Sequence, residues 1–119
     1  MSIDFKEALG HHDAALQLRA ERTRVLAANI ANESTPGYMA RDIDFAAALQ
    51  ARLDAEQGVP ALSGDGPLYR VPYHPSVDGN TVEIGVEQAA FSQNASDFQA
   101  SLAFVNLKLR GLHKAITGQ

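Results

Sequence analysis

The 119-residue chain contains no cysteine and no tryptophan. The lack of cysteine excludes disulfides, thiolate metal ligands and cysteine nucleophiles, and it suits either redox compartment. No apolar run approaches the roughly 18 residues that a membrane-spanning helix needs. The first residues also lack the basic region and apolar core of a cleavable secretory signal. If the protein acts outside the cytoplasm, we expect it to leave by a route that needs no such signal.

The common catalytic motifs are also absent. The sequence has no glycine-rich phosphate loop ending in lysine, no serine nucleophile elbow and no His-Glu-x-x-His pair. His11 and His12 are adjacent, so on a helix they point about 100° apart and chelate a metal poorly. Asp42 and Asp44 are too few carboxylates for a calcium loop. We therefore expect no catalytic residue, no metal site, no cofactor and no small-molecule substrate.

The net charge of −4 comes from the middle of the chain. Residues 32–82 hold three basic and seven acidic side chains, whereas residues 1–31 and 83–119 are each balanced. Neutral ends can pack together without long-range repulsion, and an acidic middle stays solvated. A nucleic-acid-binding protein normally carries a basic patch, and this sequence has none.

The N-terminal segment predicts one amphipathic helix from Asp4 to about Ala31. Asp4 is a suitable N-cap, with Glu7 three residues later as its reciprocal partner. Gly10 weakens the helix interior by about 1 kcal/mol relative to alanine. The main apolar stripe is interrupted by polar residues and consists of Phe5, Leu9, Leu16, Leu26 and Ile30. A second stripe runs through Ala14, Leu18 and Val25.

The end of this helix carries two amides and a turn. Asn29 and Asn32 are three residues apart, so they share one face of a helix. The pair Pro36-Gly37 predicts a type II turn, because proline fixes the first φ and glycine allows the second. Tyr38 then can fold back onto the helix end.

The middle of the chain predicts a short helix followed by irregular structure. Phe45 to about Glu56 has the spacing of a helix, and glycines and prolines recur through residues 57–80. Leu68 to Val71 could form a short strand, which Pro72 would confine to an edge. We expect an ordered loop or a small extended lobe here.

The C-terminal segment predicts a long helix with a continuous apolar seam. It begins near Asn80, which can cap with Glu83, and Gly118 stands just past its end. The seam repeats on a 4-3 spacing, as in coiled coils, through Phe91, Ala95, Phe98, Leu102, Val105, Leu109, Leu112 and Ile116.

The C-terminal helix carries more apolar surface than one partner helix can cover. Phe104 and Leu107 form a second stripe beside the seam, so residues 102–112 are apolar over most of the circumference. We therefore predict packing between molecules. The alternative is a compact monomeric bundle in which the helix at residues 45–56 covers this surface.

The predicted fold is mainly α. Two long terminal helices form an antiparallel, coiled-coil-like hairpin, accompanied by a short helix and an irregular, extended middle. The predicted segments are an N-terminal helix at 1–31, a turn and arm with an irregular middle at 32–80, and a C-terminal helix at 81–119.

Two separated motifs resemble those of the flagellar rod and hook (axial) protein family. The first matches the box that ends the N-terminal helix in that family, with Asn29, Ile30, Ala31, Asn32, Thr35, Pro36, Gly37 and Tyr38, followed by Arg41, Asp42, Asp44 and Phe45. The second, at Asp78, Gly79, Asn80 and Glu83, is similar to the segment that opens the family's C-terminal helix. The likeness is greatest to proximal-rod members, although Gly85 stands where the family usually has a charged residue.

This resemblance implies a structural subunit of the proximal rod in the periplasmic part of the bacterial flagellar basal body. Such subunits assemble through their terminal helices into the axial tube that transmits torque. The implied partners are other copies of the chain, other rod proteins, the membrane ring and the export gate. The implied export route is the flagellar type III channel, which passes unfolded subunits without a cleavable signal.

Two other classes of function are open from the residues alone. A small coiled-coil adaptor or an export chaperone would explain the apolar seam and the acidic middle, but not the two motifs. An enzyme acting on the cell wall would need convergent polar groups in a pocket, and the sequence shows no such constellation.

Overall fold

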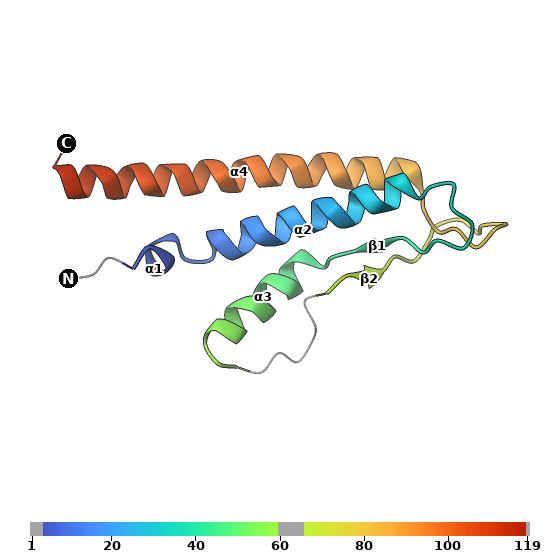
Figure 1. Ribbon diagram of the computed structural model, residues 1–119, viewed down its shortest axis with the longest axis horizontal. Coiled ribbons are helices and arrows are strands. Elements are labelled where there is room, and N and C mark those ends of the chain that lie inside the picture. Colours follow the sequence, from blue (N-terminus) through green and yellow to red (C-terminus); the bar gives the residue numbers. More distant parts are fainter. Residues whose placement is uncertain (1–3, 60–65, 119) are drawn as a thin grey trace.

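The computed structural model describes residues 4–59 and 66–118, which form an elongated molecule of 64 × 32 × 18 Å (Figure 1). The prediction of a mainly helical fold is confirmed. The elements in chain order are α1 (Phe5–Leu9), α2 (His12–Ala31), β1 (Arg41–Asp42), α3 (Phe45–Glu56), β2 (Leu68–Tyr69) and α4 (Ile84–Thr117).

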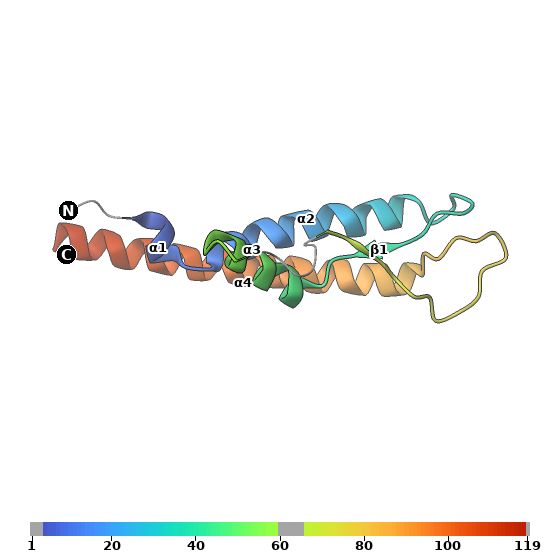
Figure 2. The same ribbon diagram turned by 90° about the horizontal axis from the view of Figure 1, so that it is seen from below.

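Helices α2 and α4 lie side by side and run in opposite directions in both views (Figures 1 and 2). This antiparallel hairpin is the predicted one. Helix α4 has 34 residues and is therefore roughly 51 Å long, whereas α2 has 20 residues. The C-terminal part of α4 consequently extends past α2, and α1 is the one described element that contacts it there. Across residues 4–59 and 66–118, no helix combines the length and apolarity that crossing a membrane requires.

The prediction of one unbroken N-terminal helix is wrong. The chain leaves the helix at Gly10, whose φ of 60° lies in the left-handed region, and α2 begins only at His12. The predicted cap is present at the start of α1, because Asp4 Oδ1 accepts the Glu7 backbone N–H at 3.3 Å. Glycine reaches the left-handed conformation without the strain that a Cβ would add, so the weak point of the helix becomes a break.

Helix α3 has the predicted bounds and packs on α2. Asp44 caps it by accepting the Ala47 backbone N–H at 3.3 Å. Its Ala48 joins Leu18 of α2 and Ile43 in a small buried apolar cluster. Because α3 contacts α2 and makes no contact with α4 among the described residues, it does not cover the apolar surface of α4. The compact-bundle alternative is therefore wrong.

The arm is built on a two-stranded antiparallel sheet in which Arg41 pairs with Tyr69 and Asp42 with Leu68. The predicted short strand is present, although it spans only Leu68–Tyr69. The Arg70 backbone N–H then donates to the Ala40 carbonyl at 2.9 Å, which extends the pairing by one bond. Part of the predicted loop, residues 60–65, lies outside the described residues.

The C-terminal helix begins later than predicted. Its N-cap is Glu83, which makes no capping hydrogen bond with its side chain, so the expected cap at Asn80 is wrong. The Asn80 side chain is buried and donates instead to carbonyls at the end of α2. At the other end, Gly118 has the left-handed φ of 73° and closes the helix as predicted.

The predicted seam of α4 does not all face the hairpin. Val105 is buried, and Phe91, Phe98 and Leu112 are half-buried. The alternate positions of the seam are exposed instead: Ala95, Leu102, Leu109 and Ile116. Glu87 and Asn94 take their place on the inner face, and both side chains are fully buried. The inner face of α4 therefore differs from the predicted seam, because Asn29 and Thr23 of α2 offer polar partners to Glu87 and Asn94.

The predicted packing residues of the N-terminal segment are covered unequally. Leu26 is fully buried, Leu9, Leu16 and Ile30 are half-buried, and Phe5 is 53% exposed. Leu18, from the second predicted stripe, is fully buried against α3. Helix α2 thus serves two neighbours, α4 on one side and α3 on another.

Candidate functional site

A polar joint connects the arm to the helix hairpin. It consists of Arg22 and Asn29 from α2, Asp42 from β1, Arg70 after β2 and Glu87 from α4. Asn29 and Glu87 are fully buried, and the other three are at most one-fifth exposed. Buried polar groups are stable only when they are paired, so the geometry of this cluster decides how firmly the arm is held.

Asn29 uses both ends of its amide. Its Nδ2 donates to Glu87 Oε2 at 2.8 Å and to the Arg41 carbonyl at 2.6 Å. Its Oδ1 accepts the Arg41 backbone N–H at 3.0 Å and the Tyr38 hydroxyl at 3.4 Å. The side chain thus pairs with Arg41 as a neighbouring strand would, and it links the last turn of α2 to both the arm and α4.

The charges of the joint balance. Arg22 forms a bidentate pair with Asp42, with distances of 2.8 and 2.9 Å. Arg70 Nη2 donates to Asp42 Oδ2 at 2.8 Å, and Arg70 Nε lies 2.9 Å from Glu87 Oε1. Two guanidinium groups therefore meet two carboxylates, and bidentate geometry adds direction as well as attraction.

The pKa of the Asp42 carboxyl is lowered by this arrangement. Burial acts to raise it, but hydrogen bonds from Arg22 and the Ile43 backbone N–H, and the charges of Arg22 and Arg70, outweigh burial. The hydrogen bond with Asp42 raises the pKa of Arg22 in turn. Both shifts favour the charged pair, so the joint is held by ions at neutral pH.

The predicted turn follows α2. The Tyr38 backbone N–H donates to the Thr35 carbonyl at 3.2 Å, and Gly37 has the φ of 74° that a type II turn requires. Asn32 does not turn inward with Asn29. Its Nδ2 donates to the Ala28 carbonyl at 2.7 Å, and its Oδ1 accepts the Thr35 hydroxyl at 3.0 Å. The two amides therefore have separate tasks.

The second sequence motif crosses the first at this turn. Asn80 Nδ2 lies 2.7–3.0 Å from the carbonyls of Asn32, Glu33 and Thr35. Backbone bonds join Gly37 to the Asp78 carbonyl at 3.0 Å and Thr81 to the Tyr38 carbonyl at 3.0 Å. A Cβ on Gly79 would lie 3.6 Å from the Gly37 Cα. The two motifs, far apart in sequence, therefore form one crossing.

The chain is similar in sequence to known flagellar proteins. Residues 9–38 match the family described as flagella basal body rod protein. The chain is 46% identical to the flagellar basal body rod protein FlgB of Cereibacter sphaeroides, over 97% of this chain and 98% of that one. The FlgB of Aeromonas hydrophila is 42% identical over 100% and 99% of the two chains, and that of Salmonella typhimurium 40% over 93% and 94%.

The chain belongs to the FlgB family. It is therefore a rod component of the flagellar basal body. The FlgB relatives carry the names of rod proteins rather than of enzymes. Residues 9–38 of the family match run from the end of α1 to the turn, so the match includes Asn29 and the first of the two segments that cross.

Several residues of the predicted FlgB-like box lie outside the joint. The Arg41 guanidinium is 5.5 Å from the ring centroid of Tyr69 on the exposed side of the sheet. Phe45 lies under the Arg19 guanidinium at 3.9 Å. Ala31, Pro36 and Gly37 are exposed, and Ile30 is half-buried. Glu83 accepts the Tyr73 backbone N–H at 2.6 Å, and its contact with His74 lowers its pKa.

Three charged members of the joint were not predicted from the sequence: Arg22, Arg70 and Glu87. Asn94 was not predicted either, and its Nδ2 donates to the Arg19 carbonyl at 2.9 Å and to the Thr23 hydroxyl at 2.8 Å. One signal was available, because Glu87 and Asn94 are seven residues apart and share a helix face with Phe91 and Phe98. Polar residues at this spacing mark an inner face that needs partners.

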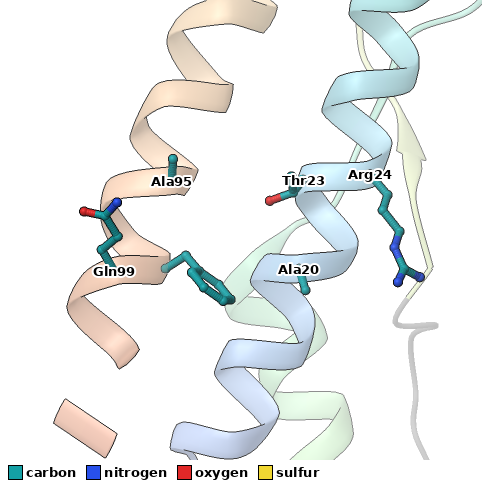
Figure 3. A pocket seen from close by; sticks show the side chains of 6 residues that line it. Ala20, Thr23, Arg24, Ala95 and Gln99 are labelled. Carbon is teal, nitrogen blue, oxygen red and sulfur yellow. The ribbon is translucent and has the colours of Figure 1, made fainter. Parts of the chain in front are cut away.

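A shallow groove lies between α2 and α4, with a volume of about 400 Å³ (Figure 3). Ala20 and Thr23 of α2 face it from one side and Ala95 of α4 from the other. Phe98, Arg24 and Gln99 complete its lining. No carboxylate or histidine lines this groove, and the described residues contain no group of three or more His, Asp or Glu side chains that could hold a metal ion.

Proposed function

We propose that the protein is a structural subunit of the proximal rod that assembles through its terminal helices into the axial tube and transmits torque. The observation that carries this proposal is the outer apolar set of α4. It consists of Leu102 (42% exposed), Phe104 (57%), Leu107 (61%), Leu109 (40%) and Ile116 (61%).

The outer apolar set needs cover from outside the chain. Burying a large aliphatic or aromatic side chain is worth about 1.5–3 kcal/mol, so five exposed ones on one half-helix represent a large unused gain. Within the described residues, α3 packs on α2 instead. Helix α1 makes only a short contact with α4, in which Lys108 Nζ donates to the Ala8 carbonyl, and His12 of α2 stacks on Phe104. Exposure on more than one side of α4 fits a helix surrounded by neighbouring helices.

The joint and the crossing would fix how the arm leaves the helices. In this proposal residues 1–31 and 81–119 supply the packing surfaces, and residues 32–80 supply the turn, the arm and contacts with adjacent subunits. The polar joint holds the arm at one angle to the hairpin, so neighbouring subunits meet arms in a repeated position. A head-to-tail contact that does not close on itself then generates a filament.

The proposed partners are other copies of this chain and other rod proteins, with the membrane ring and export gate at the base of the rod. The proposed route is export through the flagellar channel without a cleavable signal. Helix α4 depends on partners for much of its burial, which is compatible with a subunit that travels unfolded and becomes ordered on assembly.

The test replaces Leu107 with serine in a flagellated bacterium that carries this chain as its copy of the protein. We expect loss of swimming and loss of the subunit from purified basal bodies, because Leu107 is 61% exposed in the free chain. Asn106→Ser, the exposed polar neighbour, is the matched control and should swim normally. Normal swimming of Leu107→Ser at equal protein level would contradict the proposal.

A measurement on the free chain separates a rod subunit from an adaptor. We expect hydrogen exchange to be fast over residues 102–117 and slower over residues 87–98, where α4 contacts α2. Sedimentation should show a monomer that forms larger species as its concentration rises. A defined dimer with uniform protection of α4 would favour the coiled-coil adaptor instead.

A further inference from the structure

The extended segment at residues 69–73 has an inverted pattern of burial. Tyr69, Val71 and Tyr73 are 62%, 84% and 79% exposed, whereas Arg70 and Pro72 between them are half-buried. The strand itself ends at Tyr69, but exposed and half-buried residues continue to alternate up to Tyr73, which indicates that the three exposed side chains share the outer side. A strand with one side in water normally turns its apolar residues inward. These three residues, the apolar stripe of the arm, therefore face solvent, whereas the charged Arg70 faces inward.

The stripe is held on a fixed backbone. Arg70 is tied by its backbone N–H to Ala40 and by its guanidinium to Asp42 and Glu87 in the joint. Three residues on, the Tyr73 backbone N–H donates to Glu83 at 2.6 Å. The exposed rings are thus presented by an anchored segment, and a partner binding there would not have to order the backbone first.

We propose that the apolar stripe of the arm binds the C-terminal part of α4, residues 102–117, of a neighbouring copy of the chain. The inference rests on the proposed function and names the partner of the outer apolar set. Both surfaces are apolar and exposed in the free chain. Contact between the two surfaces would remove both from water.

Charge favours the same pairing. Residues 102–117 carry Lys108, Arg110 and Lys114 and no acidic residue. The described parts of the arm, residues 32–44 and 66–82, carry Arg41 and Arg70 against Glu33, Asp42, Asp44 and Asp78, a difference of −2. A basic helix and an acidic arm attract each other as they approach, and the attraction selects this orientation over contact between two arms.

The geometry makes this contact an open one. The arm beyond β2 and the C-terminal end of α4 lie at opposite ends of the 64 Å molecule (Figure 1). One copy therefore cannot bring its own two surfaces together. Because the two surfaces differ, the contact is heterologous, and each copy that binds exposes a further free surface for the next.

The absence of cysteine allows a direct test by cross-linking. The chain with Val71→Cys and Leu107→Cys, in cells and in isolated basal bodies, is treated with a short bismaleimide. We expect a ladder of dimers and larger species, because each copy carries both halves of the contact. Val71→Cys with Arg110→Cys provides a second pair in which the outer apolar set is unchanged. The control, Ala46→Cys with Leu107→Cys, places the first thiol on the exposed side of α3 and should give no ladder.

The outcomes separate this inference from the proposed function. No ladder from either Val71 pair in swimming cells would overturn the contact, as would dimers formed by Val71→Cys alone, which indicate arm against arm. Such results leave the proposed function to the Leu107→Ser test. A ladder from both Val71 pairs and none from the control supports the contact.

Discussion

The two halves of α4 have opposite patterns of burial. The first half turns Glu87 and Asn94 inward, where both are fully buried. The second half leaves large apolar side chains such as Phe104 and Leu107 outside. Burial in this helix therefore follows which partners are within reach, and not the polarity of the residue alone. Partners for the first half come from the same chain, and those for the second must come from elsewhere.

The difference shows which half of α4 fixes its register against α2. A buried Glu87 is tolerated only where Asn29 and Arg70 meet it, so sliding α4 along α2 by one turn would leave a carboxylate unpaired. An apolar surface carries no such requirement and can pack in several ways. The first half thus fixes the shape of the subunit, and the second supplies adhesion.

Replacing Glu87 with alanine should have the largest effect on the free chain. It removes one of the two carboxylates that face Arg70 and one of the two acceptors of Asn29 Nδ2, both inside the buried joint, so we expect a loss of about 3–5 kcal/mol in the free energy of unfolding. Urea unfolding followed by circular dichroism measures this loss. Glu87→Gln keeps the acceptor for Asn29 and should lose less. Equal stability of Glu87→Ala and the natural chain would show that the inner face does not need its polar residues.

Replacing Asp42 with asparagine should cost about 1.5–3 kcal/mol at pH 7, since it removes the charged acceptor of Arg22 and Arg70. The lowered pKa of Asp42 gives the pH dependence its sign. Its contribution is complete above the unfolded-state pKa of about 3.9 and is lost as pH falls through the lower folded-state pKa. Melting curves of both chains should therefore converge in acid. A difference that stays constant down to pH 2.5 would exclude the ion pairs as its cause.

Replacing Gly10 with alanine should lower the free energy of unfolding by about 1 kcal/mol, because alanine is strained in the left-handed conformation. No atom lies within 4 Å of the added Cβ, so the strain is in the backbone alone. We expect the break between α1 and α2 to straighten and the helix content to rise in circular dichroism. Gly66→Ala, which has open space and no positive φ, is the control. Unchanged helix content would mean that contacts with α4, rather than Gly10, set the break.

Replacing Leu109 with serine should change the stability of the free chain least, within about 0.5 kcal/mol, because the side chain is already 40% exposed. The same substitution should strongly reduce the incorporation of the subunit into basal bodies. Val105→Ser, on the buried side of the same half-helix, should instead destabilise the free chain. If Leu109→Ser destabilises the free chain as much as Val105→Ser, the contrast between inner and outer faces fails.

The sequence predicted elements well where the signal is local. The bounds of α3 were predicted from apolar residues at helical spacing and from the glycine and proline that follow it, and the structure adds Asp44 as its N-cap. The turn after α2 follows from Pro36 and Gly37, whose backbone preferences act over four residues. The end of α4 follows from Gly118 for the same reason.

The parts that the sequence did not predict depend on distant partners. Glu87 meets Asn29 across 58 residues, and Asn94 meets Thr23 across 71. Asn80 is a good cap by its neighbours, but carbonyls 45–48 residues away bind it instead. The seam of α4 was found, yet its direction was not, because the apolar pattern is as strong on the outer face as on the inner one. Nothing in one helix says which face its partner will take.

The crossing at Gly37 and Gly79 has a mechanical consequence. An arm joined to the helix hairpin by a single strand can rotate about that strand. Here the outgoing and returning strands pass against each other and are bonded at Asp78 and Tyr38, so rotation of either would have to stretch both. We therefore expect the arm to resist twisting as well as bending relative to the helices.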